Sequence, residues 1–413
     1  MTACNHSQPY LSAADGNSFY AKKQFYEKRL TSGTLTVTAE SNATPLETLF
    51  DIAERRNPKR AFLFVSKVLG RHIPVSPSVM RTVYRQLSAQ FPANLSGPVL
   101  YIGMAETAVG LAAGVFQETR QKVPSPVFLT STRHPVAGDL LCEFKENHSH
   151  ATDHLIYWPE DECLRQRVSQ ARTLVLIDDE ATTGNTFLNL FEALRHAGLQ
   201  QIEHVVTVTL TDWSGKSLTE RCPLPVTTVS LVDGHWQWQA DSSAPVPVMP
   251  QVNVTARGAV DIIGAQSGGR LGLDDIHGDL GTDIHAKAGE SILVLGSSEF
   301  VWQPFLLSER LEQEGAVVKF GSTTRSPIAC GHAIQSVMAF TDNYGLGIPN
   351  FLYNVAHQRF DRILLCLETP ENSVDPQLIA QLSSVAPIVE AVTYESFAYK
   401  SVTYDSTCLG QQK

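Results

Sequence analysis

The stretch Thr173-Leu174-Val175-Leu176-Ile177-Asp178-Asp179-Glu180-Ala181-Thr182-Thr183-Gly184-Asn185-Thr186 decides how we interpret this chain. It opens with an apolar run of the length of a buried strand and continues into acids and a Thr/Gly loop. A helical pattern then follows over 186–197. In an open parallel sheet, ligands bind at the carboxyl ends of the strands. The stretch therefore predicts a ligand-binding unit of strand, loop and helix.

The polar residues of this loop suit a phosphorylated sugar. Backbone N–H groups at a helix N-terminus, together with the hydroxyls of Thr182 and Thr183, can hold a phosphate. The carboxylates of Asp178 and Asp179 only accept hydrogen bonds, which suits the neighbouring hydroxyls of a ribose. The chemistry indicates a ribose 5-phosphate site, and the plainer alternative is a polar turn that caps a helix.

Strand and helix patterns alternate around this stretch. Strand-like apolar runs lie at 61–65, 98–102, 127–129, 173–177 and 204–210. Helical patterns lie at 44–56, 78–90, 107–118 and 186–197. Such alternation is typical of an α/β domain with a largely parallel sheet covered on both faces.

A second, smaller α/β unit follows a proline-containing linker at 240–254. Its predicted strands lie at 292–295, 317–320 and 362–367, with helices ending near 314, over 327–340 and over 376–382. We therefore expect a smaller Rossmann-like domain there. The predicted division is an N-terminal extension at 1–34, a first domain at 35–240, a connector at 241–284 and a second domain at 285–413.

Composition excludes several classes of protein. The 413 residues include 32 basic and 42 acidic ones, a net charge of −10 that argues against a broad nucleic-acid-binding surface. The seven cysteines are scattered without metal or redox spacing, which suits a reduced, cytoplasmic protein. No apolar stretch is long enough to cross a bilayer. We expect small-molecule partners, with no nucleic acid and no membrane.

The run of Asp-Asp, two residues and Thr-Thr-Gly-x-Thr resembles the 5-phosphoribosyl-1-pyrophosphate (PRPP) signature of type I phosphoribosyltransferases, the orotate phosphoribosyltransferase-like family. The resemblance implies that Asp178 and Asp179 contact the ribose hydroxyls and act in catalysis. It implies that the residues after Glu180 hold the 5-phosphate; these are Ala181, Thr182, Thr183, Gly184, Asn185 and Thr186. Glu180 departs from the family pattern, which usually has an aliphatic residue there.

Two further segments match the order expected for this family. The turn after the strand at 98–102 would be the pyrophosphate loop, made of Gly103, Met104, Ala105, Glu106 and Thr107. The polar stretch between the two loops would be a lid, with candidate residues Arg133, His134, His148 and His150. The cluster from His148 to His154 is compatible with a metal site, and we favour a solvated loop or substrate-contacting histidines.

Two other groups of residues leave alternatives open. Lys67, Arg71 and His72 follow a predicted strand and are either part of an anionic substrate pocket or ordinary surface charges. Trp236 and Trp238 alternate on one strand face, where packing is the better interpretation than stacking on a ring-shaped substrate.

The second domain carries its own candidate anion site. Ser326 and Pro327 look like the cap and first residue of a helix, which would place Thr324 and Arg325 beside a helix N-terminus. We expect an anion site made of Ser297, Ser298, Thr324, Arg325 and Ser326. Thr324-Arg325-Ser326-Pro327 also resembles the signature of the TRSP domain, a partner of a distinct phosphoribosyltransferase family in bacterial tellurite-resistance and stress gene clusters.

The resemblance implies an enzyme that uses PRPP to ribosylate an acceptor, in the synthesis of a nucleoside-like metabolite. Mg²⁺ would arrive with PRPP and would not be held by side chains alone. The alternative is a regulatory protein that senses PRPP or a nucleotide without turnover. A third interpretation makes the second domain another enzyme acting on the product. Relatives of this fold often dimerise, so a homodimer is a further expectation.

Overall fold

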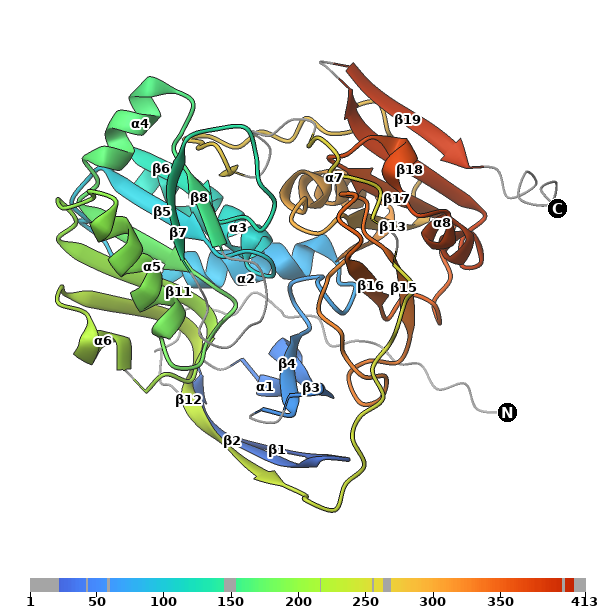
Figure 1. Cartoon of the computed structure of the whole chain (residues 1–413), viewed down its shortest axis with the longest axis horizontal. Helices are drawn as coiled ribbons and strands as arrows, with labels where there is room; N and C mark the ends of the chain where they lie inside the picture. The colour runs from blue at the N-terminus through green and yellow to red at the C-terminus, as the bar shows by residue number, and fades with distance from the viewer. Residues whose placement is uncertain are drawn as a thin grey trace.

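The computed structural model describes residues 22–41, 44–57, 60–144, 154–215, 217–254, 256–262, 269–395 and 398–404. Two α/β units lie side by side (Figure 1), the first coloured blue to yellow and the second orange to red. Each is built around a largely parallel sheet, as the sequence predicts.

Within the described residues, the sheet of the first unit has eight strands in the order β1-β2-β12-β11-β9-β5-β6, with β10 paired to β11. Strands β12, β11, β9, β5 and β6 run parallel, and the hairpin β1–β2 joins β12 in antiparallel fashion. Their bounds are β1 Lys22–Leu30, β2 Gly33–Ser41, β5 Val99–Gly103, β6 Pro126–Thr130, β9 Thr173–Ile177, β10 Glu180–Ala181, β11 His204–Asp212 and β12 Val226–Ala240.

Both faces of this sheet are covered, which explains why its central strands are apolar at successive positions. Along β9, Val175 and Ile177 pack in one core with residues of α2 (Pro77–Ala89) and α3 (Val109–Thr119). Leu174 and Leu176 pack in a second core with residues of α4 (Glu162–Ser169) and α5 (Asn185–His196). Successive side chains of a strand point to opposite faces, so one short strand serves both cores.

Two smaller hairpins and a short helix complete the first unit. These are β3 (Phe50–Glu54) with β4 (Phe62–Ser66), β7 (Leu140–Phe144) with β8 (His154–Tyr157), and α6 (Ser217–Arg221).

The N-terminal part of the chain differs from expectation in two respects. The helix predicted over 44–56 is only the single turn α1 (Leu46–Leu49), because the following residues pair with β4 as strand β3. Residues 22–34, expected in an N-terminal extension, belong to the hairpin β1–β2 and extend the main sheet.

Within the described residues, the second unit has a five-stranded sheet in the order β14-β13-β17-β18-β19. All but the edge strand β19 run parallel. The elements are β13 Ser291–Gly296, α7 Trp302–Gln313, β14 Val317–Ser322, β15 Val337–Thr341, β16 Pro349–Tyr353, β17 Arg362–Leu367, α8 Pro376–Ser383, β18 Ile388–Glu395 and β19 Ala398–Tyr404.

The predicted helix over 327–340 is wrong. That segment is irregular as far as Ser336 and then forms β15, which pairs with β16. The amides of Ala329 and Ala333 donate to the carbonyls of Glu54 and Ile52 in β3. The segment therefore lies along a strand of the first unit and hydrogen-bonds to it, so these amides do not form helical hydrogen bonds.

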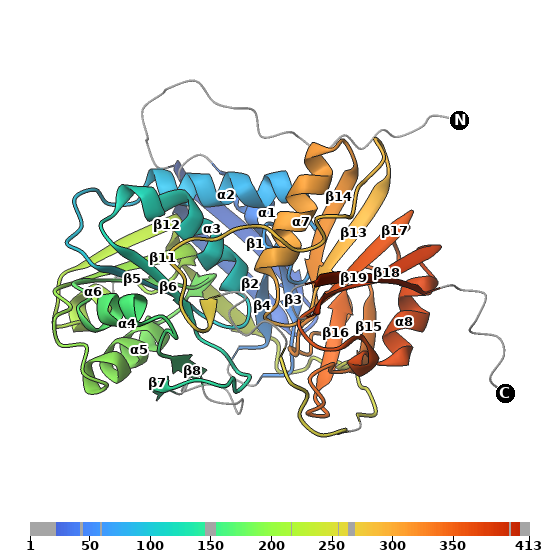
Figure 2. The same ribbon diagram turned by 90° about the horizontal axis from the view of Figure 1, so that it is seen from above.

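The two units are joined through helices α2 and α7, which pack against each other (Figure 2). Arg81 on α2 makes a two-pronged ion pair with Glu309 on α7, at 2.7 Å for each pair of atoms, and a third bond of 3.1 Å to Glu118. Its guanidinium also lies over the rings of Tyr84, Trp302 and Phe305. This arginine therefore connects polar and aromatic groups of both units.

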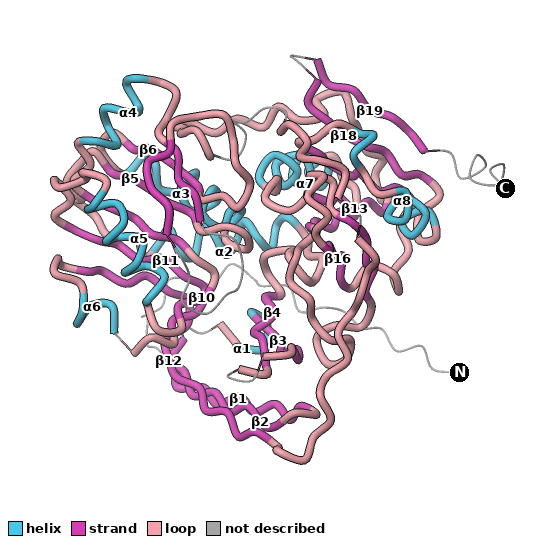
Figure 3. The backbone as a smooth tube through the Cα atoms, viewed as in Figure 1, coloured by secondary structure: helices cyan, strands magenta, loops and turns pink. Residues whose placement is uncertain are grey.

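The connector between the units is largely loop (Figure 3). One part of it pairs with the edge of the main sheet, where Leu273 and Phe128 exchange backbone hydrogen bonds. A search of the described residues finds no helix long and apolar enough to cross a membrane.

Replacing Arg81 with alanine should destabilise the protein by about 3 kcal/mol, because Glu309 and Glu118 would lose a partly buried cation. The neighbouring Arg85 is 69% exposed and contacts Glu118 only at 3.6 Å, so Arg85→Ala should change the free energy of unfolding by less than about 0.5 kcal/mol. Urea denaturation of both variants measures this. Equal losses for the two variants would contradict the role given to Arg81.

Candidate active site

The predicted strand–loop–helix unit is present at the centre of the first sheet. Strand β9 lies between β5 and β11 and is buried along its whole length. Gly184, immediately before α5, has a left-handed φ of 71°. A Cβ atom there would also come within 3.1 Å of the Leu218 side chain, so the turn into the helix favours glycine.

Asp178 and Asp179 lie at the carboxyl end of β9. The Asp178 carboxylate accepts a hydrogen bond from the Asp179 amide at 2.9 Å. Burial raises the pKa of Asp179 to about 6, with the charge of Glu180 adding to the shift and Arg71 opposing it. The two carboxyl groups therefore differ in environment, and ionising the carboxyl group of Asp179 costs more free energy than usual.

Glu180, the residue that departs from the family pattern, faces a cation. Its carboxylate pairs with Arg60 at 2.7 and 3.1 Å, and Arg60 also donates to the Thr182 hydroxyl at 3.2 Å. The guanidinium of Arg60 lies over the ring of Phe62, 4.9 Å from its centroid. Glu180 thus positions Arg60 and the start of the phosphate loop.

The predicted phosphate loop, residues 181–186, is held in place by Arg221 of α6. Arg221 donates to the side-chain oxygen of Asn185 and to the backbone carbonyl of Thr183, both at 2.6 Å. Thr183 itself is exposed. Sequence reasoning did not single out Arg221 or Arg60, because neither lies near the motif along the chain.

The predicted pyrophosphate loop lies directly beside the diacid, the pair Asp178 and Asp179. It follows β5, which neighbours β9 in the sheet, and the Met104 amide donates to the Ile177 carbonyl at 3.0 Å. The peptide bond between Ala105 and Glu106 is cis. A Cβ on Gly103 would approach the Cβ of Ala112 to 2.4 Å, so the close contact between this strand and α3 depends on glycine.

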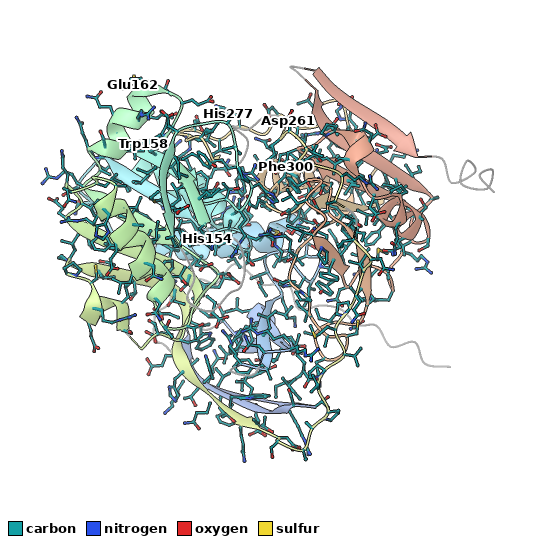
Figure 4. The ribbon with its side chains drawn as sticks, in the orientation of Figure 1. His154, Trp158, Glu162, Asp261, His277 and Phe300 are labelled. Atoms are coloured by element: carbon teal, nitrogen blue, oxygen red, sulfur yellow. The ribbon has the colours of Figure 1, made fainter. Side chains whose placement is uncertain are left out.

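A chain of hydrogen bonds leads from the pyrophosphate loop to the predicted lid. The Ala105 amide donates to the hydroxyl of Ser131 at 2.9 Å, and that hydroxyl contacts Nδ1 of His154 at 3.0 Å. Nε2 of His154 contacts Arg133 at 3.1 Å. Figure 4 labels His154 at the start of β8, on the side of the first unit that faces the second. His148 and His150 lie outside the described residues.

His134 lies between the two units. It is 4% exposed and stacks on Tyr344 of the second unit, with ring centroids 3.9 Å apart. Burial lowers the pKa of His134, although the charge of Glu299 opposes this. A neutral ring whose Nε2–H donates to the Ser298 hydroxyl, 3.3 Å away, fits this position.

The anion-site residues of the second unit meet a carboxylate of the first. Ser298 donates to Glu106 at 3.1 Å, and Thr324 does so at 3.5 Å. Ser326 is exposed and precedes irregular chain rather than the predicted helix. Ser297 is buried, and no partner for its hydroxyl lies within the described residues.

Arg71 and His72 are buried, so the interpretation of these two residues as surface charges is wrong. Arg71 donates to the backbone carbonyls of Glu106, Ser298 and Thr323. Trp236 and Trp238 both pack on Phe62, with centroids 4.9 and 5.1 Å away, in agreement with a packing role.

Comparison with known families follows the same division. Residues 49–235 match a family model described as phosphoribosyl transferase (PRTase_2), and residues 264–382 match one described as the TRSP domain C-terminal to PRTase_2. The chain carries a phosphoribosyltransferase domain followed by a TRSP domain. The match to a phosphoribosyltransferase domain supports a pentosyl-transferring enzyme. The TRSP match begins at residue 264, within the stretch that we expected to be connector.

Among solved structures, partial matches are found with phosphoribosyltransferases. The adenine phosphoribosyltransferase of Leishmania donovani is 15% identical, with 45% of this chain and 77% of that chain covered and a TM-score of 0.32. The Giardia lamblia enzyme complexed with 9-deazaadenine is 16% identical, with 46% and 96% covered and a TM-score of 0.29.

The orotate phosphoribosyltransferase of Aeropyrum pernix is 15% identical, with 41% and 79% covered and a TM-score of 0.25. Sequence identities and TM-scores this low say nothing about the substrate of this chain. No protein of curated function matches the sequence.

Proposed function

We propose that the chain is a Mg²⁺-dependent phosphoribosyltransferase that uses PRPP to ribosylate a small-molecule acceptor. The observation that supports this most directly is the adjacency of β5 and β9, which brings the pyrophosphate loop beside the diacid and the phosphate loop. One PRPP molecule needs these three groups together. The transfer chemistry belongs to the first domain, at about 35–240, with the connector at 241–284 and the second domain at 285–413.

Each part of PRPP has a matching group in this arrangement. The carboxylates of Asp178 and Asp179 accept hydrogen bonds from the ribose hydroxyls. The hydroxyls and amides from Thr182 to Thr186, at the N-terminus of α5, hold the 5-phosphate. The backbone amides of the loop after β5 would meet the pyrophosphate, and Arg133 of the predicted lid would add positive charge.

The donors fit Mg²⁺ bound together with PRPP. Within the described residues, no group of three or more His, Cys, Asp or Glu side chains is placed to hold a metal. The carboxylates of Asp178 and Asp179 would hold Mg²⁺ together with PRPP, whose oxygens would supply further ligands along with water. When bound, Mg²⁺ would neutralise charge on the leaving pyrophosphate.

The chain's own residues act by positioning and by electrostatics. As the bond to pyrophosphate breaks, C1 of the ribose becomes cation-like and is attacked by the acceptor. The diacid holds the ribose in place, and the loop amides stabilise the leaving group. No side chain has to form a covalent intermediate.

Replacing both acids, in Asp178→Asn with Asp179→Asn, should weaken PRPP binding about a hundredfold, because two charge-assisted hydrogen bonds to the ribose are lost. Isothermal calorimetry with Mg²⁺ and PRPP measures this. Asp139→Asn is a matched control, since that carboxylate is 70% exposed and pairs only with Arg165 within the described residues. An unchanged PRPP affinity in the double variant would remove the diacid from the ribose site.

PRPP binding should weaken as the pH falls. The raised pKa of Asp179, about 6, means that its carboxyl is largely protonated below that pH and loses the charge-assisted hydrogen bonds to the ribose. The dissociation constant should then rise up to about tenfold for each pH unit below 6. Asp179→Asn is the control, because titration of PRPP itself affects both proteins equally. Identical pH profiles for the two proteins would refute this assignment.

Turnover separates an enzyme from a PRPP sensor. The protein should release pyrophosphate when incubated with PRPP, Mg²⁺ and a panel of nucleobases and small nucleophiles, and mass spectrometry should identify a ribosylated product. Tight PRPP binding without pyrophosphate release for any acceptor would favour a sensor instead.

A further inference from the structure

A short segment of the TRSP domain, Ser297–Glu299 after β13, contacts both loops that flank the pyrophosphate position. Ser298 bonds to Glu106 of the pyrophosphate loop. Glu299 accepts hydrogen bonds from the Thr132 hydroxyl and the Arg133 amide, at the base of the lid. Phe300, labelled in Figure 4, closes the turn, because its backbone amide donates a hydrogen bond to the Ser297 carbonyl. The second domain therefore reaches the centre of the first domain's site.

Glu106 is an unexpected residue for a loop that binds a pyrophosphate anion. A free carboxylate there would repel the ligand. Its Oε1 accepts from the Ser298 hydroxyl at 3.1 Å, and Oε2 lies 3.5 Å from the Thr324 hydroxyl. The side chain is 11% exposed. Its charge is therefore engaged by hydroxyls of the second domain.

Arg71 fixes the same arrangement through the backbone. Its guanidinium donates to the Glu106 carbonyl in the pyrophosphate loop, and to the carbonyls of Ser298 and Thr323 at 2.7 and 2.6 Å. The Arg71 side chain is 2% exposed and also lies 3.5 Å from the Glu106 carboxylate. One buried cation thus joins the carboxyl ends of β5, β13 and β14.

Glu299 is held in place by other residues of the TRSP match, 264–382. Arg270 pairs with Glu299 at 3.1 Å and with Glu368 at 2.5 Å, and all three side chains are almost fully buried. Tyr344 donates to Glu368 at 2.7 Å. The segment that contacts the two loops therefore has a rigid support.

We propose that the TRSP domain is a working part of the PRPP site, with Ser298 and Thr324 as positioning residues for the pyrophosphate loop. They hold the Glu106 carboxylate toward the second domain, so that the loop amides meet the pyrophosphate without a competing negative charge. This inference rests on the proposed function. It gives the two domains one shared site.

The double variant Ser298→Ala with Thr324→Val removes both hydroxyl donors. It should weaken binding of Mg²⁺-pyrophosphate and of PRPP about tenfold or more, since the Glu106 carboxylate, left with Arg71 at 3.5 Å, can then turn toward the ligand. Binding of ribose 5-phosphate, which uses the loop after β9, should stay within about twofold. Calorimetry with these three ligands requires no knowledge of the acceptor. Ser384→Ala, on an exposed serine that bonds to Gln381, is the control.

The charge of Glu106 provides the decisive comparison. In a Glu106→Gln background, the same two substitutions should change pyrophosphate affinity by less than about twofold, because no carboxylate remains to be held away. An equally large loss in that background would mean that the hydroxyls act only through structure, and would overturn the proposal. So would a parallel loss of ribose 5-phosphate binding, or unchanged pyrophosphate affinity in the double variant.

Amide hydrogen exchange distinguishes this inference from failure of the proposed function. Exchange over residues 104–108 should become faster in the double variant without any ligand present. If the parent protein does not bind PRPP, the proposed function is wrong, and faster exchange would still support the contact between the domains. If exchange over these residues is unchanged, the role of Ser298 and Thr324 is refuted whatever the ligand.

Discussion

The burial of two arginines, Arg71 and Arg270, between the two domains determines the rest of the arrangement. Removing a guanidinium from water is costly unless nearly every donor finds an acceptor. Arg71 uses backbone carbonyls from both domains, and Arg270 uses two glutamates and the Thr132 hydroxyl. The partners of Arg71 come from both domains, so its charge is satisfied only when the domains are docked in one way. Arg270 neutralises Glu299, which in turn accepts from Thr132 and Arg133 of the first domain.

Local signals in the sequence predicted the parts of the structure that depend on neighbouring residues. The apolar run of β9, the acids at its end and the glycine before α5 lie within a few residues of each other, and the structure has them as expected. The helix predicted after Ser326 is absent because local signals say nothing about distant partners. A capping pattern describes only the local chain, whereas Ala329 and Ala333 bond to β3 of the other domain.

The interactions that tune the site were hidden from the sequence because their partners are far apart along the chain. Glu180 has an unusual identity for its motif, and its cation Arg60 lies just before β4 in the β3–β4 hairpin. Glu106 was predicted as part of the pyrophosphate loop without a partner for its charge, and the hydroxyls that bind it follow strands of the second domain. An acid with no basic residue near it along the chain was the available signal in both cases, but this does not indicate where the compensating group lies.

The contact between Glu106 and two hydroxyls also has a consequence for how such proteins change over time. An acid at this position suits a chain that carries serine and threonine on the facing strand ends. A phosphoribosyltransferase domain separated from its TRSP domain would keep the Glu106 carboxylate and lose the two hydroxyls that bind it. We therefore expect these three positions to vary together among related chains, and the two domains to be inherited as one unit rather than exchanged as independent modules.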